Sequence, residues 1–273
     1  MSAATPCEHL FTQRGAAALE TVRVAGGVAC VFCAPRPGAA PHNEDGAAVL
    51  ALNDRAAVLA VADGFGGQPA GERASELALE TLIAEVRAIV DAGGEVRAGV
   101  LNGFEQANRR IAELGVGAAT TLAVVVIEDD RARAMHAGDS GVLIVGQRGR
   151  VKFQAIAHSP VGYAVEAGVI EEDEALLHEE RHVVSNMLGS DEMRIDVGPH
   201  VALRVYDTVL IASDGLFDNL PTREIIERIR RGPLERGVEM LADECRQRMS
   251  GAAPETASKP DDLTVVAFRR DRR

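Results

Sequence analysis

The chain has 273 residues, 47% hydrophobic and 3% aromatic, enough for one large aliphatic core or two small ones. Its net charge of −12 and pI of about 5.1 argue against electrostatic binding of nucleic acid or of an anionic membrane. No apolar run approaches the roughly 18–20 residues of a membrane-spanning helix, and the first residues contain no signal-peptide core. We therefore expect a cytoplasmic protein that binds neither nucleic acid nor membrane.

The first half of the chain has the pattern of strands followed by a helical pair. A strand is predicted over 22–32, and a Pro-rich loop follows it. Two further strands, over 47–52 and 56–61, are joined by a hairpin signal at Asn53-Asp54. Helical spacing comes next, in two apolar faces: Leu77, Leu82, Ile83, Val86 and Val90, then Val100, Phe104, Ala107, Ile111 and Leu114.

The second half begins with strands and ends with helices and one more strand. Four strands are expected as consecutive antiparallel hairpins, over 121–127, 132–136, 142–145 and 151–156. An acidic, irregular flap then covers 158–189, with a short helix near 161–167. The remaining elements are a strand over 205–211, helices over 222–229 and 234–249, and a strand over 263–268. Thr222 is the expected N-cap of the first of these helices.

Helices thus come in two pairs among antiparallel strands. Two sheets packed face to face, with a helical pair on each outer side, would bury both sets of apolar faces. We therefore predict an α+β fold, a four-layer α-β-β-α sandwich. Residues 21–270 are predicted to form a single domain and residues 1–20 an N-terminal extension. Because no large apolar surface stripe stands out, we expect a monomer.

Cys30 and Cys33 form a Cys-x-x-Cys pair within a predicted strand. Neighbouring strand residues alternate between faces, so a spacing of three places the two sulfurs on opposite sides of the sheet. No second Cys or His pair lies at zinc-finger spacing. Buried thiols are favoured over a redox or zinc role.

Four short acidic motifs lie at the ends of apolar strands. Strand ends can converge on one rim of a sheet, where like charges repel unless a cation is bound. Mg²⁺ and Mn²⁺ take oxygen ligands, including backbone carbonyls such as that of Gly64. The alternative is that each motif is an ordinary turn. The motifs are Asn43-Glu44-Asp45, Asp63-Gly64-Phe65-Gly66-Gly67, Ser213-Asp214-Gly215 and Asp261-Asp262-Leu263-Thr264, with Gly138-Asp139-Ser140-Gly141 as a fifth, between two strands.

In this order, and with the Gly-x-x-Thr-Thr of 117–121, the motifs resemble the metal-dependent protein phosphatases, the PPM or type 2C family, in a bacterial-type member. The resemblance spans roughly Val24 to Phe268. His158-Ser159 and the segment 187–189 also resemble the flap region of the family. The resemblance implies an α-β-β-α sandwich with a metal site at one end of the sheets, and hydrolysis of phosphoserine and phosphothreonine in proteins.

The resemblance also implies roles for particular residues. Glu44, Asp63 and the Gly64 carbonyl would hold one Mn²⁺ or Mg²⁺, and Asp63, Asp214 and Asp261 a second. Asp45 would bind through water, and Asp139 with Asp214 would take a third ion. The catalytic set is then Asp63, Asp214 and Asp45. Two metal ions lower the pKa of a bridging water, so that a hydroxide attacks phosphorus directly without a covalent enzyme intermediate.

Two positions depart from the family pattern. Many members carry an Arg that grips the phosphate where this chain has Ala40, and Arg36 on the Pro-rich loop is a candidate replacement. Some members carry a general-acid His where this chain has Phe65. His42 and His136 are candidate substitutes, with a structural role as the alternative for each.

Three functions remain open from the sequence. The first is an active serine/threonine protein phosphatase that acts on phosphorylated proteins and opposes a Ser/Thr kinase. The second keeps the fold and acts on an anti-anti-sigma-type regulator. The third is a non-catalytic binding module. The intact carboxylate set argues against the third, because clustered acids without a cation cost stability. The acidic stretch 171–180 is expected to be a solvated face, with recruitment of a basic partner as the alternative.

Overall fold

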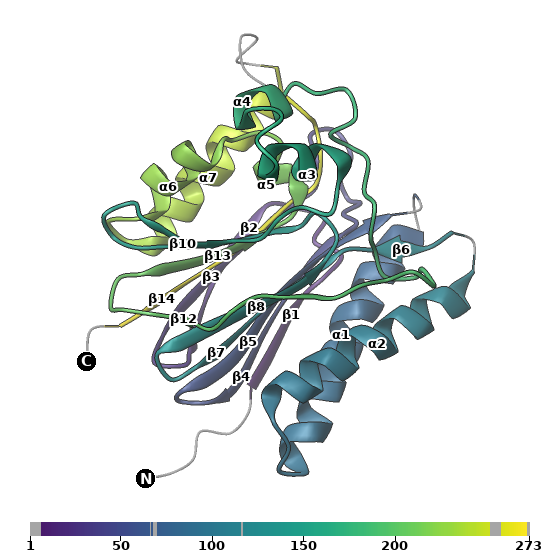
Figure 1. Cartoon of the computed structure of the whole chain (residues 1–273), viewed down its shortest axis with the longest axis vertical. Helices are drawn as coiled ribbons and strands as arrows, with labels where there is room; N and C mark the ends of the chain where they lie inside the picture. The colour runs from purple at the N-terminus through teal and green to yellow at the C-terminus, as the bar shows by residue number, and fades with distance from the viewer. Residues whose placement is uncertain (1–6, 66, 68–69, 116, 252–257, 272–273) are drawn as a thin grey trace.

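The computed structural model describes residues 7–65, 67, 70–115, 117–251 and 258–271, and it is built around two antiparallel sheets (Figure 1). The first sheet has the order β1-β4-β5-β7-β8-β11, with β12 paired to β8 and β6 paired to β5. Its strands are β1 (Cys7–Phe11), β4 (Asp45–Asn53), β5 (Ala56–Phe65), β6 (Ala119–Thr120), β7 (Leu122–Glu128), β8 (Arg131–Ala137), β11 (Asp196–Val197) and β12 (Val201–Ala202).

The second sheet has the order β10-β9-β13-β14-β3-β2, so its central strands come from opposite ends of the chain. In it, β14 pairs with both β13 and β3, which joins the C-terminal strand to an early hairpin. Its strands are β2 (Ala18–Val24), β3 (Gly27–Ala34), β9 (Gly141–Val145), β10 (Val151–Gln154), β13 (Thr208–Ala212) and β14 (Leu263–Arg270).

Helices cover the outer face of each sheet (Figure 1). The long pair α1 and α2 packs on the first sheet through side chains such as Leu79 and Phe104. The pair α6 and α7 packs on the second sheet through Ile225 and Leu241. The helices are α1 (Ala70–Asp91), α2 (Val96–Leu114), α3 (Pro160–Glu166), α4 (Glu172–Ala175), α5 (Asp214–Phe217), α6 (Thr222–Ile229) and α7 (Leu234–Met249).

A separate aliphatic layer lies between the two sheets. It is formed by residues that alternate with the outward-facing ones along each strand, including Leu59, Val125, Ile211 and Val266. Three apolar layers therefore separate four layers of secondary structure, and the predicted α-β-β-α sandwich is confirmed. No helix within the described residues has the length and hydropathy to cross a bilayer.

Most of the local predictions are confirmed. The hairpin between β4 and β5 turns at Asn53, whose side-chain oxygen accepts a hydrogen bond of 2.8 Å from the Arg55 amide. The helical faces of α1, α2 and α7 are buried as their spacing predicts. Two end positions differ, because Val90 is only half-buried and Leu114 is exposed.

The predicted strand over 22–32 is wrong in its extent. It is divided into β2 and β3 by a turn at Ala25 and Gly26, both of which have positive φ. The stretch predicted as an N-terminal extension also contains strands. Residues 7–11 form β1, which pairs with β4 at the edge of the first sheet, and β2 already begins at Ala18. β1 gains its backbone partner from a distant part of the chain, whereas β2 pairs with β3, which follows it directly.

The prediction of consecutive hairpins from 121 to 156 is wrong at its centre. β7 pairs with β8 in the first sheet and β9 with β10 in the second, so the chain changes sheet between β8 and β9. The turn is made at Gly138, whose φ is +114°, a value that favours glycine. A Cβ at this position would lie 2.5 Å from the Thr121 side chain. The link therefore carries Asp139 between the two sheets.

The predicted N-cap Thr222 is instead the first residue of α6, and its amide contacts the acidic stretch 171–180. Pro221 is the N-cap residue of α6, and the Thr222 amide donates to Glu172 Oε1 at 2.7 Å. Asp173 pairs with Arg223 at 2.6 Å. A carboxylate of the flap thus satisfies a free N–H of α6 and interacts favourably with the helix dipole. Part of the stretch predicted as a solvated face is a structural contact.

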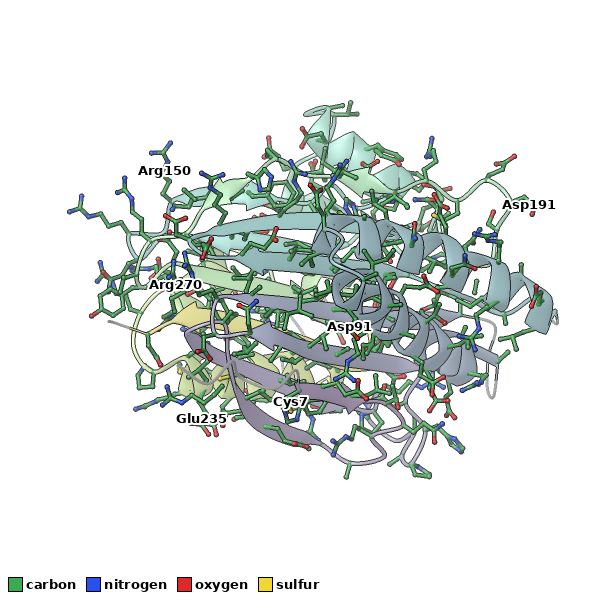
Figure 2. All side chains as sticks on the ribbon, turned by 90° about the horizontal axis from the view of Figure 1, so that it is seen from below. Cys7, Asp91, Arg150, Asp191, Glu235 and Arg270 are labelled. Atoms are coloured by element: carbon green, nitrogen blue, oxygen red, sulfur yellow. The ribbon has the colours of Figure 1, made fainter. Side chains whose placement is uncertain are left out.

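The cysteine prediction is confirmed in its geometry. Cys30 faces the α6–α7 layer and Cys33 the layer between the sheets, so the two thiols lie on opposite faces of β3. Burial raises the pKa of Cys30 to about 11 and that of Cys33 to about 12, and it also raises the pKa of Cys245. Cys7 is exposed on the edge strand β1 (Figure 2).

Thiol alkylation of the native protein tests this arrangement. Because thiolate is the reactive form, iodoacetamide near neutral pH should label Cys7 and leave Cys30, Cys33 and Cys245 unlabelled. Mass spectrometry of the digested protein measures the label on each residue. All four should react in denaturant, and labelling of Cys30 or Cys33 at the Cys7 rate in the native protein would contradict the described packing.

Candidate active site

The hairpin of β4 and β5 brings the first two predicted acids together. Asp45 begins β4 and is paired with Asp63 near the end of β5. Asp63 is fixed by its neighbours on the next strand. Its amide donates to Thr121 Oγ1 at 3.0 Å, and its carbonyl accepts from Thr120 Oγ1 at 2.8 Å. The Gly-x-x-Thr-Thr motif thus orients Asp63.

The second sheet supplies the facing side of the site. Ser213 follows β13 and donates its hydroxyl hydrogen to Asp45 Oδ2 at 2.7 Å. The same hydroxyl accepts from the Thr264 amide at the start of β14, at 3.1 Å. Asp214 is the first residue of α5, directly after Ser213. One serine therefore joins the ends of strands from both sheets, at the rim where the acids lie.

Asp262 anchors the loop that carries Glu44. Its two carboxylate oxygens accept hydrogen bonds from the amides of Arg36 and Glu44, each at 2.7 Å. The Gly64 amide in turn donates to the Glu44 carbonyl at 3.2 Å. The Pro-rich loop is thus tied to β5 and to the start of β14.

Asp139 lies on the link that crosses between the sheets. The link is held in place by Thr121 Oγ1 and Ser140 Oγ, which lie 2.6 Å apart. Burial and the Asp214 carboxylate raise the pKa of Asp139, and its Oδ1 atom has no hydrogen-bond partner among the described residues. The same holds for Asp214 Oδ1 and Glu44 Oε1. These are buried oxygens that lack a donor.

Mutual repulsion is the dominant electrostatic feature of this rim. Burial, then the neighbouring carboxylates, raises the pKa of Asp63 well above its ordinary value, and those neighbours are Asp45, Asp214, Asp261 and Asp139. The same two causes raise the pKa of Asp45 and of Asp139, and they raise that of Asp261 to about 7. Acids that raise one another's pKa in this way stay ionised only if a cation is close.

Lys259 supplies one positive charge to the rim. Its ammonium group contacts carboxylate oxygens of Asp214, of Asp218 at 2.8 Å and of Asp261 at 3.2 Å. Those three carboxylates in turn raise the pKa of Lys259, although burial opposes them. Asp218 is the C-cap residue of α5, four residues after Asp214, and burial and the Asp214 carboxylate raise its pKa to about 6.

The donor set fits a hard divalent cation. The oxygen atoms come from carboxylates and from a backbone carbonyl, which are the ligands that Mg²⁺ and Mn²⁺ prefer. Glu44 and the Gly64 carbonyl also approach each other beside Gly71 in α1. A Cβ at position 71 would lie 2.3 Å from Glu44 Oε1 and 3.0 Å from the Gly64 carbonyl oxygen. Glycine at 71 leaves this space free.

A more compact group of side chains of the types that bind metal ions lies elsewhere. Donor atoms of His136, His158 and Asp196 come within 4.8 Å of one another, which the rim carboxylates among the described residues do not. His158 Nδ1 accepts from the Gly138 amide at 3.0 Å, so its proton is on Nε2, which faces Asp196 at 3.1 Å. A protonated nitrogen cannot coordinate a cation. This group joins β8, β11 and the flap by hydrogen bonds.

The two histidines proposed as general acids lie in different surroundings. His136 is buried, stacks on His158 at 4.4 Å and bonds through Nε2 to the Ile156 carbonyl at 2.9 Å. It therefore lies within the flap contact. His42 is on the surface, and its Nδ1 is 3.2 Å from Glu72 in the first turn of α1.

The structure therefore brings together Asp45, Asp63, Asp139, Asp214 and Asp261, with Glu44 and the Gly64 carbonyl beside them. Gly66, which belongs to the predicted turn, lies outside the described residues. Sequence reasoning missed Asp218 and Lys259. The short helix α5 was not predicted, although the Asp-x-x-x-Asp spacing of 214 and 218 would place both acids on one face of a helix.

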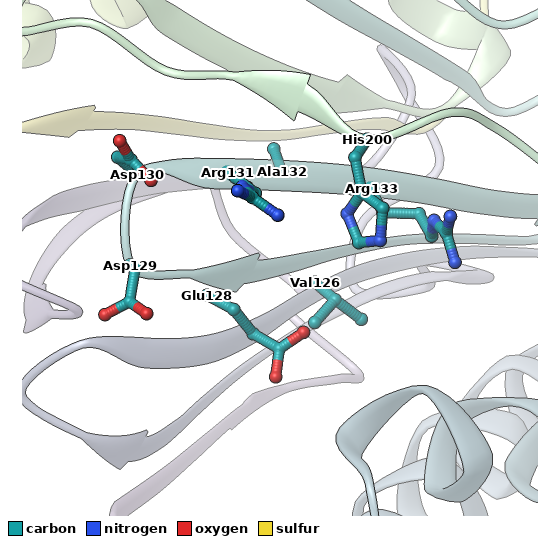
Figure 3. A pocket seen from close by; sticks show the side chains of 8 residues that line it. All are labelled: Val126, Glu128, Asp129, Asp130, Arg131, Ala132, Arg133 and His200. Carbon is teal, nitrogen blue, oxygen red and sulfur yellow. The ribbon is translucent and has the colours of Figure 1, made fainter.

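One hollow lies beside this rim and another lies far from it. A cavity of about 110 Å³ between α3, α4 and α5 includes Asp139, Asp214 and the apolar side chains of Val161 and Phe217 in its lining. A second hollow, of about 300 Å³, lies at the turn between β7 and β8 (Figure 3). Because β7 begins next to Thr121, this turn is at the opposite end of the sheet from the acids. The acids thus belong to the flap side of the molecule.

Comparison with known proteins agrees with this geometry. Residues 40–250, more than half of the chain, match the family model described as Protein phosphatase 2C. The protein phosphatase PhpP of Streptococcus pneumoniae is 35% identical over 176 residues, which cover 62% of this chain and 70% of PhpP.

Two solved structures share the fold. MsPP, a PPM Ser-Thr phosphatase from Mycobacterium smegmatis in complex with cacodylate, is 28% identical with a TM-score of 0.70, and the match covers 89% of this chain and 98% of MsPP. The catalytic domain of the phosphatase PstP, in complex with 2 manganese ions, is 23% identical with a TM-score of 0.64, over 98% of this chain and 100% of that domain. Together with the acids gathered at the rim, these matches place the chain in the protein phosphatase 2C family, as a bacterial-type member.

Proposed function

We propose that this chain is a metal-dependent protein serine/threonine phosphatase that hydrolyses phosphoserine and phosphothreonine in proteins. The observation that carries the proposal is the gathering of buried carboxylates on the rim of a 2C-type fold, with three of their oxygens lacking a donor among the residues that the structure describes. Relatives named as protein phosphatases support the reaction class.

Each acid has a role in this proposal. Glu44, Asp63 and the Gly64 carbonyl would hold one Mn²⁺ or Mg²⁺, and Asp63, Asp214 and Asp261 would hold a second. Asp139 with Asp214 would take a third ion. When bound, such ions lower the pKa of a water molecule and offset the negative charge of the phosphate.

The other residues of the rim orient these ligands. Thr120 and Thr121 hold the backbone of Asp63, and the Asp262 carboxylate holds the amide of Glu44. Asp45 accepts from Ser213, which leaves its other oxygen to orient water. Preorganised ligands of this kind do not have to be rearranged during the reaction.

Arg36 is our candidate for gripping the substrate phosphate in place of the residue missing at Ala40. Its amide donates to Asp262. Burial raises the pKa of Glu44 and of Asp262, and the nearby Arg36 guanidinium partly offsets this rise. The side chain itself is exposed, which leaves its donors free for a phosphate.

We further propose a cytoplasmic monomer that opposes a Ser/Thr kinase. Four free cysteines are consistent with a reducing compartment. The exposed large apolar side chains are divided between the flap, with Val169 and Leu177, and α7, with Met240, which does not suggest one dimer surface. A kinase is implied because phosphoserine and phosphothreonine must first be formed.

Asp214→Asn tests the proposed metal site, because the substitution keeps the shape of the side chain and removes its charge. We expect turnover of a phosphothreonine peptide with Mn²⁺ to fall at least about 100-fold. Asp91→Asn is the matched control, since Asp91 is exposed (Figure 2) and ends α1, at the opposite end of this helix from Gly71 beside the rim. Wild-type turnover in Asp214→Asn, or loss of turnover in the control, would contradict the assignment.

Arg36→Ala tests phosphate binding. The KM for a phosphopeptide should rise about tenfold, because a charge-assisted hydrogen bond to the phosphate is lost, while the Kd for Mn²⁺ changes little. Arg23→Ala serves as the control. Arg23 is exposed and pairs with Asp271, which follows the end of β14 opposite to Asp262. An unchanged KM would show that Arg36 is an ordinary solvated side chain.

A further inference from the structure

Lys259 contacts two of the acids that would hold the second ion of the proposed centre. Its ammonium group contacts Oδ2 of Asp214, Asp218 and Asp261, and its side chain is only 18% exposed. Asp214 and Asp261 are the acids proposed for the second ion. A divalent ion and an ammonium group that share these oxygen atoms repel each other, so binding of the ion there favours displacement of the ammonium group.

The backbone of Lys259 is held firmly in this position. The Asn219 side chain accepts from the Lys259 amide at 2.9 Å and donates to the Lys259 carbonyl at 3.0 Å. The side-chain amide of Asn219 also donates to the Gly215 carbonyl in α5 at 3.0 Å. Asn219 is fully buried. The ammonium group is therefore on a flexible side chain with a fixed base, so it can leave the acids without any change in the backbone.

The use of lysine at this position is unusual for this chain. Of its 29 Lys and Arg residues only two, Lys152 and Lys259, are lysines. A lysine ammonium is a compact charge that can approach three carboxylates from one point, whereas an arginine guanidinium is planar and larger. Lys152 makes its ion pair with Asp207 and lies away from the rim.

We propose that Lys259 is a tethered counter-ion that occupies the Asp214–Asp218–Asp261 part of the centre in the metal-free protein and must be displaced when a divalent ion binds there. This inference rests on the proposed function. It predicts that the two parts of the centre differ. The part at Glu44 and the Gly64 carbonyl binds its ion without such competition, and the Lys259 part binds more weakly.

Titration calorimetry with Mn²⁺ tests the competition without measuring activity. In Lys259→Met the Kd of the weaker site should fall about tenfold or more, because no ammonium group has to be displaced. The metal-free variant should also melt at a lower temperature than the wild type, and Mn²⁺ should restore its stability. Lys152→Met removes the same charge and should leave both Kd values unchanged.

Amine labelling gives a second readout in the unaltered protein. Acylation of Lys259, followed by mass spectrometry, should increase when Mn²⁺ is added, because the displaced ammonium group becomes accessible. Lys152 is the internal reference and should react equally with and without the ion. If Lys259→Met does not fold, Lys259→Gln and this labelling still decide the question.

The outcomes separate the two proposals. Suppose that the wild type and Lys259→Met bind Mn²⁺ with the same Kd values, and that labelling of Lys259 is the same with and without the ion. The counter-ion proposal is then wrong and the phosphatase proposal stands. If neither protein binds Mn²⁺, both proposals are wrong.

Discussion

Repulsion among buried carboxylates at the rim of two sheets is the constraint on which this structure depends. The sandwich places strand ends side by side, and the ends of β4, β5, β13 and β14 carry acids whose pKa values are raised by burial and by one another. Surrounding groups partly relieve the repulsion, among them the Ser213 hydroxyl and the Lys259 ammonium. The apolar layers must supply enough stability to hold these charges together.

The sequence predicts the fold well where local spacing determines it. Strand and helix periodicity predicted the β4–β5 hairpin and the three long helices, because each pattern reflects one buried face. It did not predict that the chain changes sheet at Gly138, since the same turn residues can close a hairpin or start a crossing. It also missed β1, whose partner is separated from it by more than thirty residues of sequence.

The same limit applies to the site. Acidic motifs at strand ends predicted which carboxylates gather, because strand ends converge on a rim. The role of Lys259 could not be predicted, since it depends on contacts with α5 and on an Asn219 side chain forty residues away in sequence. Asp262, the second acid of its motif, received no role from the sequence, and in the structure it accepts the amides of Arg36 and Glu44. Such contacts exist only after the sheets have paired.

The contact between the flap and α6 has a consequence for how the molecule responds to a bound substrate. Glu172 satisfies the Thr222 amide, and α3 and α4 line the cavity next to Asp139. Any ligand that lifts the flap would leave the first turn of α6 without its acceptor and favour fraying of that helix. If a ligand in the cavity lifts the flap, its binding and the order of α6 would be thermodynamically linked, and amide hydrogen exchange at Thr222 would report on that event.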